Sequence, residues 1–501
     1  MATRGLVRLF TRTLFDMSSS SGDTVFALSS GQGKCGVAVI RVSGPRASDV
    51  ILNLGQFKSL PKPRAATLRR LRDPLSGDII DHGLSIWFPG PNSFTGEDCV
   101  EFHVHGGKAV ISSVLNSLSS LPGLKHAEPG DFTKRALLNG KLDLTEVEGL
   151  SDLIHAETEA QRKQALRQMK GDLSKLYNGW SESLLKSLAN VEAIIDFGED
   201  ENIEEGLLEQ VCRQIEELSK EIQSHLQDGR RGERLRSGIQ VTIIGAPNAG
   251  KSSLLNILCQ RPAAIVSPYA GTTRDVIESS LDISGYPVVI SDTAGLRQVS
   301  DPVEKEGIKR AVERTHCRVE SADLNILIVD SSLCKDNLST LQCPEPEVLK
   351  KLCSMNPSVS EERVLERLNH NNTLIVMNKT DLLPSSHTIA PDNSNLICWV
   401  SCTTRKGIEN FLDVLKNRLQ MLGGDPLADS PHLTQQRHRH HLQDCSCSIQ
   451  RFLDCVKKGE SDIVVAAEEL RSALKEIGRI TGKTDVEEIL DVIFKDFCIG
   501  K

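Results

Sequence analysis

The strongest constraint on this chain is a series of short polar motifs between residues 245 and 403, most of which follow an apolar, strand-like run. The first motif, GAPNAGKS at residues 245–252, matches the pattern G-x-x-x-x-G-K-[ST]. Glycines at these spacings let backbone N–H groups close around phosphates at the N-terminus of a helix, here expected over 253–258. Lys251 can reach the β- and γ-phosphates, and the Ser252 hydroxyl can bind Mg²⁺.

Three later motifs identify the nucleotide. Asp292 begins DTAG, whose Gly295 N–H would meet the γ-phosphate, with Asp292 near Mg²⁺. In NKTD at 378–381, the Asp381 carboxylate can accept two hydrogen bonds from guanine N1 and N2, which adenine cannot supply. The last motif, SCT at 401–403, has Cys402 where many such loops have Ala. The set predicts a GTP-hydrolysing site formed by Gly245, Asn248, Ala249, Gly250, Lys251, Ser252, Ser253, Asp292, Gly295, Asn378, Lys379, Asp381, Ser401 and Cys402.

The pattern of apolar residues predicts an α/β multidomain chain. Strand-like runs at 241–244, 288–291, 324–330, 374–378 and 398–401 alternate with helical segments, which indicates a mostly parallel sheet. Before them, residues 23–120 read as strands and short helices, with strands at 37–42 and 99–104. Residues 144–227 and the segment after 426 have helical spacing, so we expect one helical bundle interrupted by an inserted Ras-like P-loop domain.

Domain boundaries follow from the breaks in these patterns. A polar, glycine-containing break is expected at 229–234, and Gly423-Gly424 closes the inserted domain. We therefore expect a targeting segment at 1–20, an N-terminal α/β domain at 21–143, helical parts at 144–235 and 425–501, and the nucleotide domain at 236–424. Within it, 331–372 is a long polar segment expected to hold one helix.

Composition restricts the setting in which the chain works. The net charge of −8 argues against a broad basic surface for bulk DNA but leaves room for a local patch that holds a structured RNA. The 14 cysteines are scattered without a secretory signal, which favours reduced thiols. No apolar run reaches the roughly 18 residues of a membrane span. Arg4, Arg8 and Arg12 precede the first acid, Asp16, which favours a mitochondrial transit peptide over an ordinary basic terminus.

The segment between the first two motifs indicates which branch of the GTPases this chain resembles. GTTRD at 271–275 makes this region resemble the TrmE–Era–EngA branch of GTPases. The resemblance implies that Thr273 binds Mg²⁺ in switch I. Leu296 stands where Ras-like enzymes have the Gln that orients water. In this branch a K⁺ ion supplies the missing polarity, and the resemblance assigns it to Asn248, Ser267, Tyr269 and Thr272.

The whole plan from residue 23 to 501 resembles the MnmE/TrmE family of tRNA wobble-uridine modification GTPases, in its mitochondrial form. The segments that carry this resemblance are SFTGED at 93–98, HGG at 105–107, PGDFT at 129–133, NGKLDL at 139–144 and CIGK at 498–501. The resemblance implies that Glu304 helps to position water, whereas a solvated helix charge is the alternative. It also makes Cys498 a catalytic residue for the modification, whereas an inert tail thiol is the alternative.

For the N-terminal domain, the resemblance implies a site for 5,10-methylenetetrahydrofolate or a related tetrahydrofolate, formed by Arg41, Glu101, Lys141 and Lys501. It further implies a homodimer through this domain, with G-domain dimerisation in the GTP state. The implied reaction takes place in the mitochondrial matrix, with an FAD-dependent MnmG-type partner. It modifies C5 of U34 in tRNA to a taurinomethyl derivative, with K⁺-stimulated GTP hydrolysis.

Two other functions remain open from sequence. An Era-like ribosome-assembly GTPase would carry an RNA-binding domain such as a KH fold, with its GXXG loop, after the nucleotide domain. A scaffold that only dimerises through its G domains would leave Cys498 and the folate-type residues idle. Metal binding is not expected at His103 and His105 or along 437–447, because no further ligands stand at zinc-like spacing.

Overall fold

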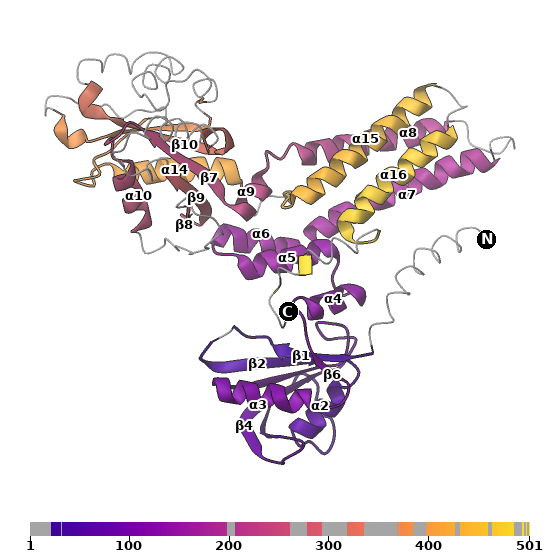
Figure 1. The fold of residues 1–501 in the computed structure, drawn as a ribbon. Helices are drawn as coiled ribbons and strands as arrows, with labels where there is room; N and C mark the ends of the chain where they lie inside the picture. The colour runs from indigo at the N-terminus through magenta and orange to yellow at the C-terminus, as the bar shows by residue number, and fades with distance from the viewer. Residues whose placement is uncertain are drawn as a thin grey trace, which may run out of the picture. The chain divides into compact units, whose positions relative to one another are not determined.

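The computed structural model describes residues 22–31, 33–197, 206–260, 278–292, 318–334, 368–369, 371–383, 397–425, 431–458, 463–484, 493–494, 497 and 500 (Figure 1). The chain divides into two compact units. The first contains residues 1–151, 168–182 and 474–501, and the second contains residues 152–167 and 183–473. Within the described ranges, no helix is long and apolar enough to cross a membrane.

The first unit contains a six-stranded sheet in the order β3-β4-β5-β2-β1-β6. Its strands are β1 (Thr24–Leu28), β2 (Cys35–Ser43), β3 (Thr67–Arg72), β4 (Ile79–Phe88), β5 (Cys99–Gly106) and β6 (Leu124–His126). All neighbours are antiparallel except β1 and β6. The strands expected at 37–42 and 99–104 are confirmed as parts of β2 and β5.

Alternation along these strands separates a buried face from an open one. Helices α2 (Ala47–Leu54) and α3 (Lys108–Ser119) pack on the first face, where Ile40 and Phe102 are fully buried with Val114 and Leu118. Residues of opposite parity, such as Arg41 and Glu101, point to the other face because successive side chains alternate. The sheet therefore presents polar groups on the side that α2 and α3 do not cover.

The chain then becomes helical, as expected. The first unit includes α4 (Asp131–Leu138), most of α5 (Leu144–His155) and the start of α7 (Asp172–Phe197). Phe494 packs against Gly130 just before α4, and a Cβ on Gly130 would lie 2.7 Å from the Phe494 ring. Residues near the C-terminus thus return to the N-terminal unit.

The second unit holds a second six-stranded sheet, in the order β12-β11-β10-β7-β9-β8. Its strands are β7 (Ile239–Gly245), β8 (Glu278–Ile283), β9 (Tyr286–Asp292), β10 (Leu324–Asp330), β11 (Thr373–Asn378) and β12 (Ile397–Trp399). Only the β8–β9 pair is antiparallel. The mostly parallel sheet is confirmed, and β12 ends two residues earlier than the sequence predicted. Helices α10 (Lys251–Cys259) and α14 (Ile408–Gly423) pack against this sheet, consistent with the helix expected over 253–258.

The helical segments on either side of this sheet form one bundle. Within the second unit, α8 (Leu207–Leu226) packs along α15 (Gln436–Lys458). Arg439 on α15 reaches Asp228 after α8 at 2.8 Å, and Arg471 on α16 (Ile463–Thr481) reaches Glu192 on α7 at 2.9 Å. The interrupted bundle is therefore confirmed.

One local prediction was wrong. The expected break at 229–234 is instead mostly a short helix, α9 (Arg231–Ser237), which follows a tight turn at Arg230. Glu233 in α9 accepts hydrogen bonds from Arg230 and Arg439, so ion pairs hold this polar sequence in a helix. The single helix expected in 331–372 and the targeting segment at 1–20 lie largely or wholly outside the described residues. The domain boundaries remain predictions.

Candidate nucleotide site

The phosphate-binding motif lies between β7 and α10. Gly245 ends β7, where an added Cβ would lie 2.5 Å from the Ile328 carbonyl oxygen of neighbouring β10. Gly250 precedes α10 with φ of 108°, a conformation that side chains other than hydrogen rarely adopt. The sequence GAPNAGKS thus folds into the tight strand-to-helix connection that leaves N–H groups at a helix N-terminus available for an anion.

Lys251 extends back over this loop. Its ammonium donates hydrogen bonds to the carbonyl oxygens of Gly245 at 2.7 Å and Ala246 at 2.9 Å. Ser252 and Ser253 in the first turn of α10 are exposed. A hard cation such as Mg²⁺ prefers oxygen ligands, so the Ser252 hydroxyl fits the metal role that the motif predicts.

Asn378 connects this loop to the base-binding loop. It is 2% exposed at the end of β11, its Nδ2 donates to the Ala249 carbonyl at 2.8 Å, and its Oδ1 accepts from the Cys402 N–H at 3.1 Å. A Cβ on Gly250 would collide with the same Nδ2. One buried amide therefore fixes the spacing between the phosphate motif and residues 401–403.

Asp381 is oriented by its neighbour across the site. The Ser401 hydroxyl donates to Asp381 Oδ1 at 2.6 Å, and the Thr404 N–H donates to the same hydroxyl at 3.1 Å. Asp381 remains exposed. A fixed, exposed carboxylate with acceptor capacity matches the adjacent N1 and N2 donors of guanine.

Asp330 was missed by the sequence analysis. It ends β10 in register with Asn378 and accepts a hydrogen bond from Lys379 Nζ at 2.7 Å, while Ser332 donates both its hydroxyl and its N–H. Burial alone would raise the pKa of Asp330, but the hydrogen bonds and the Lys379 charge outweigh it and lower the pKa from its ordinary value. An acid at the end of a buried strand was the only signal available in sequence.

The switch regions fall largely outside the described residues. Asp292 ends β9, and its backbone pairs with Ile243 of β7, next to the phosphate loop. Asn248 is exposed in that loop with φ of 60°. Ser267, Tyr269, Thr272, Thr273, Gly295, Leu296 and Glu304 lie outside the described residues, so their roles remain predictions. Burial raises the pKa of Cys402, which keeps the thiol protonated and unreactive.

In the first unit, the structure brings two of the folate-type residues together. Arg41 Nε and Nη2 donate to the same Glu101 oxygen at 3.0 and 2.9 Å, and the guanidinium lies over the rings of Phe94 and Phe132. Lys141 is exposed after α4, with its Cγ beside Gly96. Both candidate cations therefore border the loop 93–98.

The end of the chain meets the same sheet. The Gly500 carbonyl accepts a hydrogen bond from Ser29 Oγ at 2.9 Å, and Gly500 has φ of 96°. Ser29 directly follows Leu28, the last residue of β1. Leu28 pairs with Ile40 of β2, and Ile40 precedes Arg41 in the sequence. Cys498 and Lys501 lie outside the described residues, but Gly500 between them lies near the strands that carry the candidate folate residues.

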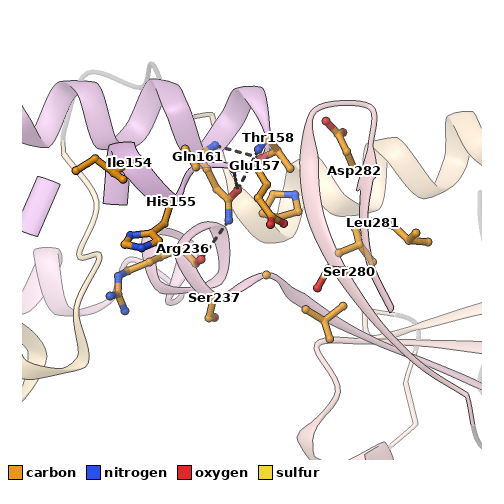
Figure 2. Close-up of a pocket in the computed structure, with 15 residues that line it drawn as sticks. Ile154, His155, Glu157, Thr158, Gln161, Arg236, Ser237, Ser280, Leu281 and Asp282 are labelled. Carbon is orange, nitrogen blue, oxygen red and sulfur yellow. Dashed lines mark hydrogen bonds between the residues drawn. The ribbon is translucent and has the colours of Figure 1, made fainter. Parts of the chain in front are cut away.

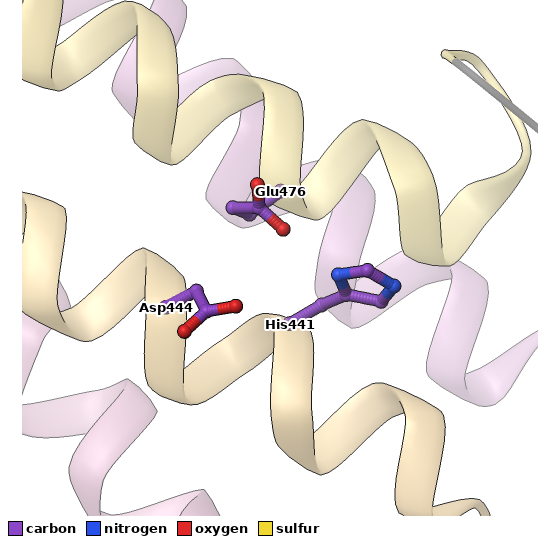
Figure 3. A group of neighbouring side chains, drawn as sticks. All are labelled: His441, Asp444 and Glu476. Carbon is purple, nitrogen blue, oxygen red and sulfur yellow. The ribbon is translucent and has the colours of Figure 1, made fainter.

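The histidines considered for metal binding have protein partners. His103 Nε2 lies 3.4 Å from Glu101, and His105 Nδ1 lies 2.8 Å from Asp81. His441 and Asp444 lie on α15 and Glu476 on α16 (Figure 3). Glu476 belongs to the first unit, whereas His441 and Asp444 belong to the second.

A pocket of about 430 Å³ lies where the β8–β9 hairpin meets the helical segments (Figure 2). It is lined by residues 154–158 and Gln161 at the junction of α5 and α6 (Glu159–Met169), by the end of α9 and by both strands. Gln161 Oε1 accepts from the N–H groups of Glu157 and Thr158, and its Nε2 donates to the Arg236 carbonyl at 3.2 Å.

The Ala160 N–H donates to the Gly285 carbonyl in the hairpin turn at 3.0 Å. The hairpin that runs towards Asp292 is thus bonded directly to α6.

Known proteins match almost the whole chain. A model of the GTP-binding protein TrmE N-terminus matches residues 24–141, and a model of the MnmE helical domain matches residues 144–498. The mitochondrial 5-taurinomethyluridine tRNA synthase subunit GTPB3 of Danio rerio is 52% identical, over 98% of this chain and 96% of that protein. The Homo sapiens protein of the same name is 51% identical, over 100% and 98%. The tRNA modification GTPase MnmE of Parvibaculum lavamentivorans is 47% identical, over 96% and 100%.

The role of Asp381 can be tested by Asp381→Asn. Two hydrogen bonds to a charged acceptor contribute about 1.5–3 kcal/mol each, so we expect GTP affinity to fall at least about 100-fold. Xanthine has a carbonyl in place of the guanine amino group, so the amide should favour xanthosine triphosphate. Equilibrium titration with fluorescent nucleotides measures both, with Asp413→Asn on the exposed face of α14 as the control. Unchanged GTP affinity would contradict the assignment.

Asp330→Asn tests whether the buried carboxylate positions Lys379. Loss of this charge-assisted bond should weaken GTP binding about tenfold and speed GTP release, with the Asp413→Asn control unaffected. Because the pKa of Asp330 is lowered from the ordinary value of an aspartate, the carboxylate is ionised from pH 5 to pH 8 and the interaction is lost only as pH falls through the lowered pKa. We therefore expect the ratio of mutant to wild-type affinity to be flat across that range. A release rate equal to wild type would show that Asp330 has no positioning role.

Proposed function

Because the chain belongs to the MnmE/TrmE family of tRNA modification GTPases, we propose that it hydrolyses GTP as one subunit of a mitochondrial enzyme that modifies C5 of the wobble uridine, U34, of tRNA. The observation that carries the proposal is the buried amide of Asn378, which joins the phosphate loop to the guanine-binding residues. The mitochondrial relatives support a taurinomethyl product, because they are named as subunits of the 5-taurinomethyluridine tRNA synthase.

GTP would bind with its phosphates at the start of α10 and its base between Lys379 and Asp381. Ser252 and Thr273 would hold Mg²⁺, which neutralises charge on the phosphates during transfer. Lys251 would leave the Gly245 and Ala246 carbonyls for the β- and γ-phosphates. Asp381, already oriented by Ser401, would accept the two guanine donors.

A tetrahydrofolate would bind beside β2 and β5 and supply the one-carbon unit. The Glu101 carboxylate is a suitable acceptor for the donor edge of a pterin, while Arg41, Lys141 and Lys501 could pair with folate carboxylates. Arg41 is held in place by Glu101 and by two aromatic rings, which supports a preformed site. An FAD-dependent MnmG-type partner would share the reaction, and Cys498 would deliver a thiol to it.

In the proposed cycle, the change between the GTP-bound and GDP-bound states is transmitted to the folate site and Cys498 through the helical segments. The β8–β9 hairpin lies in sequence between Thr273 and Asp292, two residues assigned to the Mg²⁺ site, and its turn is bonded to α6 through Gly285 and Ala160. A shift of either strand would therefore move α6. Homodimerisation through residues 21–143 and G-domain association in the GTP state complete the proposed cycle.

The Era-like alternative is not favoured. It requires an RNA-binding domain after the nucleotide domain, whereas the described C-terminal residues form α15 and α16, and the MnmE helical model extends over them. The scaffold alternative gives no reason for Arg41 to be held by Glu101 and by the rings of Phe94 and Phe132.

Potassium dependence tests the hydrolytic mechanism. We expect GTP hydrolysis to be at least about tenfold faster in K⁺ than in Na⁺, because Leu296 cannot orient water and a bound cation would supply the polarity. Glu304→Ala should lower the rate in K⁺ by about 100-fold, within the range for a residue that assists proton transfer. The exposed Glu320→Ala serves as the control. Equal rates in both salts would exclude the potassium role.

Mass spectrometry of tRNA nucleosides tests the function itself. In cells that lack the protein, we expect mitochondrial wobble uridine to lose its C5 group, and wild-type chain to restore it. Cys498→Ser should fail to restore the modification while hydrolysing GTP normally. Cys447→Ser, which changes an exposed cysteine on α15, should restore it fully. Normal wobble uridine with defective ribosomal particles would support the Era-like alternative instead.

A further inference from the structure

One edge of the N-terminal sheet carries an unusual concentration of positive charge. Six of the fifteen residues from 58 to 72 are Lys or Arg, and no Asp or Glu occurs from 50 to 72, in a chain whose net charge is −8. The cations are Lys58, Lys62, Arg64, Arg69, Arg70 and Arg72, and we call them the basic edge. They lie on β3, an outer strand of the sheet, and on the segment that leads into it.

Within the described ranges, these cations are not neutralised by acidic side chains. In the part of the chain that the structure describes, none of the six forms an ion pair with a carboxylate, whereas Arg41 and Arg135 in the same unit are paired with Glu101 and Glu97 at 2.9 and 2.7 Å. Lys58, Lys62 and Arg70 are exposed. The nearest acid in sequence, Asp73, accepts hydrogen bonds from Ser117 and from the backbone of Leu75 and Ser76.

The remaining cations of the basic edge are held in defined positions. The Arg69 guanidinium stacks on the Phe57 ring at 4.2 Å, and Arg72 donates to the Gly77 carbonyl at 2.8 Å. Arg64 has φ of 58°, and its N–H donates to the Trp87 carbonyl of β4 at 2.8 Å. Three of the six cations are therefore held in place on β3 and its approach, which suits a ligand with several anionic groups.

The basic edge also lies close to the candidate folate residues. Trp87 pairs with Val100 of β5, whose neighbour is Glu101, so only β4 separates Arg64 from the strand that carries Glu101. Neighbouring strands are about 4.8 Å apart, so the backbone of Arg64 lies about 10 Å from the strand that carries Glu101. A polyanion bound along the edge would bring its neighbouring nucleotides within reach of the Arg41–Glu101 pair.

We propose that the basic edge binds the phosphate backbone of the substrate tRNA and presents the nucleotide to be modified to the Arg41–Glu101 region. This inference rests on the proposed function. Four of the six cations are arginines, whose planar guanidinium pairs with phosphate and stacks on bases. Surface-lying membrane segments are instead amphipathic helices, whereas these residues occupy a strand and an extended approach.

The test removes charge without removing structural contacts. The triple variant Lys58→Gln/Lys62→Gln/Arg70→Gln changes three exposed side chains that make no hydrogen bond or ion pair within the described part of the chain. The control variant Lys108→Gln/Lys186→Gln/Lys416→Gln removes the same charge from exposed positions elsewhere. Binding of transcribed mitochondrial tRNA to the full chain is measured by fluorescence anisotropy from 50 to 300 mM KCl.

Each lost phosphate contact should lower the slope of log affinity against log salt by about 0.7–0.9. We therefore expect the triple variant to bind tRNA about 30- to 100-fold more weakly near physiological salt, with a slope smaller by about 2. The control variant should bind like wild type, and both variants should hydrolyse GTP at the wild-type rate without tRNA, which shows that the nucleotide domain is unaffected.

The outcomes separate the two proposals. If wild type and control bind tRNA and the triple variant binds equally well with the same slope, the basic edge is rejected and the proposed function stands. If wild type binds no tRNA, the basic edge is rejected as a tRNA site of this chain, whereas the analysis of wobble nucleosides decides the proposed function separately. Loss of binding to vesicles containing 30% phosphatidylserine, with unchanged tRNA binding, would assign the basic edge to a membrane surface and overturn the RNA proposal.

Discussion

The architecture of the nucleotide site depends on the Asn378 side chain. Its amide donates to the phosphate loop through Ala249 and accepts from the base loop through Cys402. The group is buried, so both hydrogen bonds act in a medium of low dielectric constant and an unsatisfied partner would be costly. Asp381, Ser401 and Lys379 surround this connection, and each is positioned by a further polar contact. In the proposed site, the residues that would select the base and those that would bind the phosphates are therefore positioned by the same side chain.

Much of the fold could be predicted from sequence because its elements are local patterns. The buried strands β7 and β11 are apolar runs that end in the motif residues Gly245 and Asn378, so the strands and the phosphate loop could be placed from sequence. The interrupted bundle was predictable because both flanking segments share helical spacing. Helix α9 was not, because its stability comes from Arg439, which lies 206 residues from Glu233 in sequence.

Functional residues without a motif were harder to find. Asp330 contacts Lys379, which follows the neighbouring strand. In sequence, a single acid at the end of a strand cannot be told from an ordinary solvated charge. The docking of Gly500 on Ser29 joins residues 471 apart, which no local pattern encodes. The basic edge was obscured by the acidic total charge, because a chain-wide sum hides a fifteen-residue segment of opposite sign.

The interrupted bundle also constrains the order in which the chain folds. Arg439 and Asp228, which join its two halves, are 211 residues apart. Because the nucleotide domain separates α8 from α15 in sequence, α15 can cover the apolar side of α8 only when that domain is compact enough to bring its two ends together. Assembly of the helical part therefore depends on the folding of the domain inserted into it.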